Sequence, residues 1–324
     1  MIECLVEEGI AEHRAILIKD GHIHYARIDW PGSLAEGQIE DAVLIARAAG
    51  STRGTARFAS GEQALVDRLP RVASEGAAIR LEVTRAAMPE EGRVKLAQAK
   101  PAESALRPRP TLVQSLRTLG YVPKVVRRFP ACDWDELWAE AANGTAAFTG
   151  GSLHFAPTPA MTVVDVDGDL KPRDLALAAV PAFVSAARRF DLAGSIGIDF
   201  PTLEAKADRK AVDALLGDLL ADWQHERTAM NGFGFVQIAA RLRHPSLLHL
   251  LRYRKAEASA RRLLRQGEMV DEAGTVLLTC NPAVEAALRP QWLDELARRC
   301  GRPVRVTVDP ALATTATFAQ AVPA

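Results

Sequence analysis

Three aspartates occur within five residues in the segment MTVVDVDGDL, residues 161–170, directly behind an apolar run. Asp165, Asp167 and Asp169 offer the carboxylate oxygens that Mg²⁺ and Ca²⁺ prefer as ligands. The calcium-loop pattern D-x-[DN]-x-[DN]-G-x5-E is not met, because the glycine stands at the fourth position and Ala176 takes the place of the glutamate. An EF-hand is therefore excluded, and Asp169 fits an ordinary turn.

A fourth aspartate, Asp199, lies between Ile198 and Phe200 in the apolar segment SIGIDF. A carboxylate in a buried strand is costly unless its charge is met or it reaches a strand end. If the strands that carry Asp165 and Asp199 are adjacent, their C-terminal ends bring the two carboxylates together. Such a pair predicts a Mg²⁺ site of the phosphoryl-transfer type, with retained waters and a substrate phosphate completing the shell. In the alternative, both acids cap neighbouring helices.

The elements that position these residues alternate between strands and helices, which favours α/β sheet domains in the second half of the chain. We expect strands at 161–165, 195–200 and 232–239, and helices at about 172–190, 203–227 and 245–266. A last β-α-β unit and a loose tail from residue 314 follow.

The first half of the chain is rich in short strand patterns. Residues 13–32 predict two strands joined by a turn at Asp20 and Gly21. From Gly37 to Lys100, five short strands with glycine-rich turns predict a small barrel of the OB type, a frequent RNA-binding platform. Cations and one stacking ring would come from the barrel segment: Arg53, Arg57, Phe58, Arg85, Arg93 and Lys95.

Two further segments connect the halves. Residues 100–110 contain three prolines and predict a linker. Residues 133–144 predict a short helix with Asp133 as its N-cap.

Composition sets the remaining limits. The 324 residues are 48% hydrophobic and 25% charged, which is typical of a globular protein of two or three modules. The net charge is zero, so a nucleic-acid surface would have to be local; residues 241–266 carry eight Lys/Arg and a single acid. A solvated helix face explains that stretch equally well. The four cysteines lie far apart, which predicts reduced thiols in a cytoplasmic protein and no zinc knuckle. The longest apolar runs fall well short of a membrane span, so we expect no membrane partner.

These segments resemble the ribonuclease E/G endoribonucleases over most of the chain. The segment GGSLHFAPTPAMTVVDVDG is similar to the family stretch that ends in D-[IV]-[ND]-[ST], and DLAGSIGIDF is similar to L-G-G-x-[IV]-x-[IV]-D-F. The segment NGFGFVQIAARLRHPSL resembles R-F-G-L-x-E-M-[ST]-R-x-R-x-x-P-S-L. The opening strands, the barrel and the segment GRPVRVTVDPAL also have counterparts in the family, in the same order.

The resemblance implies an α+β/α/β multidomain fold. Its expected parts are an RNase H-like subdomain at 1–36 and, after a linker, at 101–160; an S1-like OB barrel at 37–100; a DNase I-like catalytic domain at 161–255; and a small C-terminal subdomain at 256–324.

The resemblance also implies roles for particular residues. Asp165 and Asp199 match the two magnesium-binding aspartates, and Asp167 falls where the family has an assisting asparagine. The implied chemistry is hydrolysis of single-stranded RNA with Mg²⁺ or Mn²⁺, leaving a 5′-phosphate and a 3′-hydroxyl. Phe58 matches a barrel aromatic that stacks on a base.

Departures from the family pattern limit these expectations. The stretch from Pro101 to Arg127 is too short for the family's 5′-monophosphate sensor, so we expect no such sensing. No cysteine lies between residues 247 and 279, so we expect no structural zinc, and any homodimer would lack the zinc link. The family's Arg and Glu in R-F-G-L-x-E are Gly232 and Gln237 here, and Arg241 and Arg243 are the expected substitutes on the phosphate backbone. The replaced arginines leave open a catalytically inactive RNA-binding protein, or a scaffold that does not bind RNA.

Overall fold

The computed structural model describes residues 2–323. A first sheet, in the order β11-β1-β2-β3, is built from β1 (Glu3–Glu8), β2 (His13–Lys19), β3 (His22–Asp29) and β11 (Pro123–Val126). The hairpin predicted at Asp20–Gly21 is confirmed: both residues have positive φ, 54° and 82°, as a two-residue type I′ turn requires.

Two helices accompany this sheet. Helix α1 (Leu112–Thr118) covers one face, where Leu112 and Leu116 pack on Cys4 and Val6. Helix α2 (Trp134–Asn143) agrees with the predicted helix at 133–144 and ends at Gly144 in the left-handed conformation. Asp133 does not cap α2 with its side chain, because its carboxylate accepts a hydrogen bond of 3.0 Å from the Ile23 N–H instead.

A closed five-stranded barrel confirms the small barrel predicted between residues 37 and 100. Its strands are β4 (Ile39–Arg47), β5 (Gly54–Arg57), β6 (Gln63–Val66), β7 (Ala78–Arg85) and β10 (Ala97–Pro101), in the order β10-β6-β5-β4-β7. Between β7 and β10 the chain forms a separate hairpin of β8 (Met88–Glu90) and β9 (Arg93–Lys95). The segment GRVKLAQA therefore divides between β9 and β10 and is not one barrel strand.

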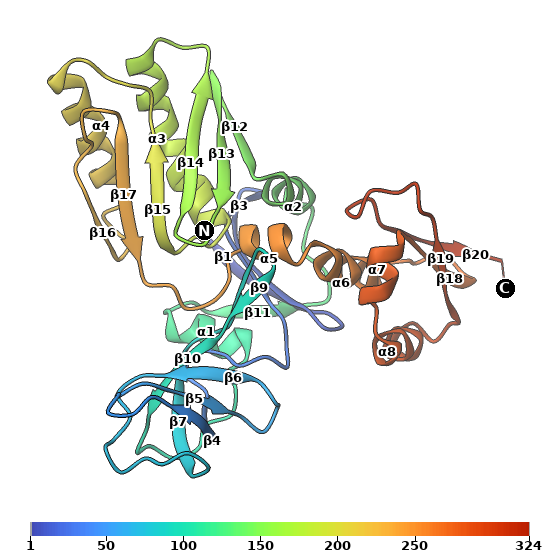
Figure 1. The fold of residues 1–324 in the computed structure, drawn as a ribbon. Coiled ribbons are helices and arrows are strands. Elements are labelled where there is room, and N and C mark those ends of the chain that lie inside the picture. The colour runs from blue at the N-terminus through green and yellow to red at the C-terminus, as the bar shows by residue number, and fades with distance from the viewer. Residues whose placement is uncertain (1, 324) are drawn as a thin grey trace.

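The sheet that carries the aspartates has six strands in the order β12-β13-β14-β15-β17-β16. They are β12 (Thr145–Phe148), β13 (Gly151–Pro157), β14 (Thr162–Gly168), β15 (Gly194–Asp199), β16 (His225–Arg227) and β17 (Phe235–Ala240). Helices α3 (Pro172–Arg189) and α4 (Lys206–Leu219) lie against one face of it (Figure 1). Among the described residues, Figure 1 draws no helix over the other face.

Two expected helices differ from the structure. The helix expected at 203–227 ends at Leu219, and His225–Arg227 form an edge strand that satisfies backbone groups of β17. The helix expected at 245–266 is broken at Arg254 into α5 (Leu247–Tyr253) and α6 (Lys255–Glu268).

The C-terminal part is a sheet in the order β19-β18-β20, made of β18 (Thr275–Cys280), β19 (Val304–Val308) and β20 (Phe318–Val322), with α7 (Pro282–Ala287) and α8 (Pro290–Cys300). The tail expected to be loose thus pairs as β20 with the free edge of β18. In Figure 1 the barrel and this C-terminal sheet lie apart, each at its own end of the molecule.

One hydrophobic core joins the first sheet to the six-stranded sheet. Helix α3 packs between them, and Phe183 on α3 belongs to the same cluster as Ile16 of β2 and Ile198 of β15. The barrel and the C-terminal sheet have separate cores. In the part of the chain that is described, no helix is both long and apolar enough to cross a membrane.

Candidate metal centre

The carboxylates of Asp165 and Asp167 lie on the open face of the six-stranded sheet. Side chains alternate along β14, so that Val164 and Val166 are buried toward α3 while the two aspartates are exposed on the opposite face. Asp199 is likewise exposed at the end of β15, between the buried Ile198 and Phe200. The burial cost that its apolar neighbours suggested therefore does not arise.

The register of the two strands places the carboxylates side by side. Strands β14 and β15 are parallel neighbours, and Asp165 is the direct Cα partner of Asp199. Neighbouring strands lie about 4.8 Å apart, and side chains of directly paired residues point to the same face. The expectation that adjacent strands bring Asp165 and Asp199 together is confirmed.

The capping alternative is wrong. Helix α3 has Lys171 at its N-cap and helix α4 has Ala205, and neither cap receives a side-chain hydrogen bond. Within residues 2–323, no ion pair or side-chain hydrogen bond joins Asp165 or Asp199 to another side chain. Two like charges therefore face each other in water without a protein cation between them, which is unfavourable in the absence of a bound cation.

A histidine extends this row of residues across the sheet. His154 on β13 is the Cα partner of Asp165, so it shares the open face with the two carboxylates. Its Nε2 lies 2.9 Å from the Ser152 Oγ, and Ser152 in turn is the partner of Asp167. His154 was not predicted from the sequence, because its position beside Asp165 depends on the pairing register of β13. The alternation in SLHFAP was the only signal in the sequence that could have placed it on the exposed face.

The donor set suits a hard divalent cation. Mg²⁺ commonly takes only one or two protein carboxylates and keeps several waters, which substrate phosphate oxygens can replace. Asp165 and Asp199 provide such a pair, and Asp167 lies two residues further along the same face of β14. Among the described residues, no group of three or more His, Cys, Asp or Glu side chains is close enough to form a full protein cage for a metal.

Two residues expected to bind RNA are buried. Phe58 is 2% exposed in the barrel core, so its ring is not available to stack on a base. Arg85 is 8% exposed and donates a hydrogen bond of 2.6 Å to the Leu96 carbonyl. Both side chains hold the barrel together instead. The expectation of RNA contacts from Phe58 and Arg85 is corrected accordingly.

Three of the other basic residues expected to bind RNA form ion pairs, whereas Arg57 is exposed and has no ion pair within residues 2–323. Arg93 and Lys95 lie on the β8–β9 hairpin and both form ion pairs with Glu90, at 2.7 and 2.9 Å. Arg53 pairs with Asp67 at 2.8 Å on the barrel itself.

Arg241 and Arg243 lie at the wrong end of β17 to reach the carboxylates. Asp199 pairs with Phe235 at the start of β17, whereas Ala240, the residue before Arg241, pairs with Gly194 at the other end. At about 3.4 Å per residue, this separates Arg241 from the level of Asp199 by roughly 20 Å along the strand.

Both guanidinium groups instead face the barrel side of the molecule. They form ion pairs with Glu36, at 3.3 Å for Arg241 and 3.2 Å for Arg243. The Arg243 carbonyl also accepts a hydrogen bond of 2.8 Å from the Ala86 N–H, next to the end of β7. Arg241 and Arg243 therefore help to fix the barrel against the sheet.

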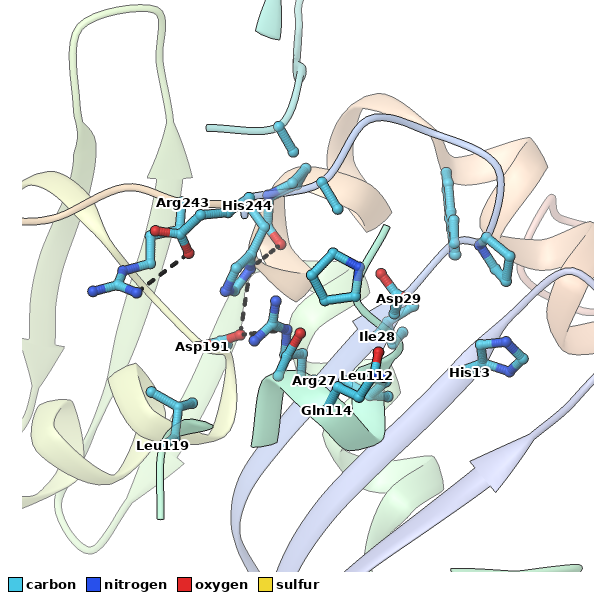
Figure 2. A pocket seen from close by; sticks show the side chains of 18 of the residues that line it. His13, Arg27, Ile28, Asp29, Leu112, Gln114, Leu119, Asp191, Arg243 and His244 are labelled. Atoms are coloured by element: carbon cyan, nitrogen blue, oxygen red, sulfur yellow. Dashed lines mark hydrogen bonds and ion pairs between the residues drawn. The ribbon is translucent and has the colours of Figure 1, made fainter. Parts of the chain in front are cut away.

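These two arginines line a large cleft of about 2510 Å³ between the barrel, the first sheet and the six-stranded sheet. Figure 2 shows Arg27, Asp191, Arg243 and His244 gathered at its wall. Asp191 lies 4.0 Å from Arg27 and 3.5 Å from the His244 Nδ1. Burial, and then the charge of Arg27, lowers the pKa of His244 and keeps its ring neutral near pH 7. Neither Asp165 nor Asp199 is among the residues that line this cleft.

Comparison with models of protein families gave no match for the chain, and no curated protein matched it. The functional assignment therefore depends on the carboxylate pair and its surroundings.

Proposed function

We propose that the protein is a metal-dependent endoribonuclease that hydrolyses single-stranded RNA to 5′-phosphate and 3′-hydroxyl ends. The observation that carries the proposal is the direct pairing of Asp165 with Asp199 on adjacent parallel strands, exposed and without a cationic partner. We infer single-stranded RNA as the substrate class from the motifs around these two residues, which resemble those of the ribonuclease E/G family.

The proposed roles follow from the positions of the side chains. Asp165 and Asp199 would hold Mg²⁺ or Mn²⁺, and Asp167 would assist from the same face of β14. When bound, such an ion activates a water and neutralises charge on the phosphate. His154, held near Ser152, lies beside Asp165 and is placed to carry a proton at the open face.

The barrel supports an RNA substrate through its topology. When the five barrel strands are numbered 1 to 5 in chain order, their spatial order around the barrel is 1-2-3-5-4, and strand 4 closes onto strand 1. The third and fifth strands, β6 and β10, pair in parallel. We infer an OB-type barrel, a fold that binds oligonucleotides in many proteins. Residues 102–127 contribute only α1 and β11, so the proposal includes no separate module for sensing a 5′-monophosphate.

A second candidate function is RNA binding without catalysis. The observation that favours it is the distance of Arg241 and Arg243 from the carboxylates, and their pairing with Glu36. Neither arginine is near enough to stabilise charge on a phosphate bound at Asp165 and Asp199. The two candidates predict different results in one assay.

The assay is cleavage of a 5′-labelled, unstructured AU-rich RNA with Mg²⁺, by the wild type, Asp165→Asn and Asp199→Asn. Each RNA is tested with a 5′-monophosphate and with a 5′-hydroxyl. The nuclease predicts metal-dependent cleavage that is lost in both variants and is indifferent to the 5′ end. RNA binding that persists in both variants, with no cleavage by the wild type, would support the binding protein instead.

A further inference from the structure

The turn before β17 presents an aromatic ring to solvent close to the carboxylate pair. Phe233 is 81% exposed, although most large apolar side chains of this sheet are buried. It belongs to the connection between β16 and β17, and Phe235, two residues later, is the Cα partner of Asp199. At 81% exposure the phenyl ring removes little apolar surface from water within the chain, so its face is open to a ligand.

Local hydrogen bonds hold the turn in one conformation. The Asn231 Oδ1 accepts hydrogen bonds from the N–H groups of Phe233 and Phe235, at 2.9 and 3.0 Å. The Asn231 N–H donates to the Phe235 carbonyl at 3.1 Å, and the Gly234 N–H donates to the Asn231 carbonyl at 3.2 Å. The backbone under the Phe233 ring is therefore fixed by four hydrogen bonds within five residues.

The turn is also fastened to the strand end that carries Asp199. The Phe200 N–H donates a hydrogen bond of 3.2 Å to the Gly234 carbonyl. Gly234 has φ of +90°, and a Cβ there would lie 2.4 Å from the Phe200 carbonyl oxygen. Only glycine allows this close approach. Phe233 therefore directly precedes the residue whose backbone contacts Phe200, the neighbour of Asp199.

Apolar side chains continue from this turn onto the open face. A Cβ at Gly197, two residues before Asp199, would lie 2.4 Å from the Phe235 Cζ and 3.0 Å from the Met161 Sδ. The Phe235 ring and the Met161 thioether therefore cover Gly197 directly next to the carboxylates. The open face thus combines a polar row, His154–Asp165–Asp199, with the apolar side chains of Met161 and Phe235, and Phe233 lies two residues before Phe235 in the turn.

We propose that Phe233 is a stacking platform for an unpaired base of the nucleic-acid strand whose phosphate lies at Asp165 and Asp199. The inference rests on the proposed function and adds the feature that would select single strands. A base within a duplex is already stacked and paired, whereas an unpaired base can lay its π-face on the phenyl ring. The fixed turn lowers the entropy cost of holding the ring in place.

The test measures binding without catalysis. Oligoribonucleotides that carry 2-aminopurine at successive positions are titrated at low salt with Ca²⁺ in place of Mg²⁺, and quenching of the fluorophore reports stacking. We expect Phe233→Ala to weaken binding about fivefold to a hundredfold and to abolish quenching at one or two positions, and Phe233→Trp to retain both. Val72→Ala is the matched control, because Val72 is an 88% exposed apolar residue outside this sheet.

An abasic nucleotide at the quenched position should make the wild type and Phe233→Ala bind equally. Affinity and quenching that are unchanged in Phe233→Ala would overturn the inference, even if the wild type cleaves RNA. Quenching that depends on Phe233, in a protein that fails to cleave, would support the platform while removing the nuclease proposal.

Discussion

The unpaired carboxylates of Asp165 and Asp199 make a prediction about stability that does not depend on activity. Their Cα atoms are direct partners on adjacent strands, about 4.8 Å apart, and both side chains project to the same exposed face, so the separation of the two charges is on the order of 5 Å. Coulomb's law in bulk water gives a repulsion of about 0.8 kcal/mol at that distance. We therefore expect Asp199→Asn to raise the free energy of unfolding by about 0.8 kcal/mol in EDTA at low salt, because the substitution removes one of the two charges.

Metal reverses the order of stabilities. At a free Mg²⁺ concentration ten times the dissociation constant, a site that exists only in the folded protein stabilises it by about 1.4 kcal/mol. The wild type should gain this amount, while Asp199→Asn, with one carboxylate left, should gain little. The wild type would thus be the less stable protein in EDTA and the more stable one in Mg²⁺.

The assay is urea denaturation in EDTA and across a Mg²⁺ titration at constant ionic strength. Asp169→Asn is the matched control, because it removes the same charge from the turn after β14 without touching the pair. Asp169→Asn should remain parallel to the wild type throughout. If Asp199→Asn and Asp169→Asn respond to Mg²⁺ alike, the carboxylates do not form the metal site.

Three other predictions concern residues outside the pair. Phe58→Ala should destabilise the barrel by about 3–5 kcal/mol, because the ring is buried in its core, and circular dichroism during denaturation would measure the loss. Burial lowers the pKa of His249 from its ordinary 6.5 to about 4, so the folded protein resists protonation there. Stability should therefore be complete above pH 6.5 and fall by up to about 3 kcal/mol as the pH drops to 4; His249→Gln should flatten this slope in urea denaturation. Because Glu36 already pairs with both groups, Arg241→Gln combined with Arg243→Gln should weaken RNA binding by less than about threefold in a filter-binding assay.

Each of these predictions has an outcome that contradicts it. A stable Phe58→Ala protein with much weaker RNA binding would place the ring in contact with a base. An unchanged pH slope in His249→Gln would show that other groups cause the loss of stability in acid. A large loss of RNA affinity in the double arginine variant, with a smaller dependence on salt, would assign Arg241 and Arg243 to the phosphate backbone.

Local patterns predicted much of the carboxylate site. The alternation in TVVDVDG and the apolar segment SIGID located β14 and β15 and placed an aspartate at the C-terminal part of each. The parallel α/β arrangement then implied that these aspartates meet. The Asp20–Gly21 hairpin and the barrel could likewise be predicted from the sequence, because turn residues determine local backbone conformation directly.

The errors occurred where the answer depends on partners distant in sequence. Phe58 follows β5 next to exposed arginines, and only closure of the barrel directs its ring inward. The position of Arg241 depends on the direction of β17 relative to β15, which the motif does not encode. His225–Arg227 follow directly on an apolar helical period that ends at Trp223, but they pair with β17, because its edge groups need partners. The position of His154 beside Asp165 depends on the strand register, and the exposure of Phe233 depends on the turn before β17.

Mass spectrometry of the products of RNA cleavage in H₂¹⁸O with Mg²⁺ shows directly whether a water at the carboxylate pair attacks the phosphate. Attack by a water held at Asp165 and Asp199 predicts one ¹⁸O in each new 5′-phosphate and an unlabelled 3′-hydroxyl on the other fragment. Asp165→Asn and Asp199→Asn should yield no such product. Cyclic 2′,3′-phosphate ends without ¹⁸O, or labelled products formed equally by the two variants, would contradict the claim.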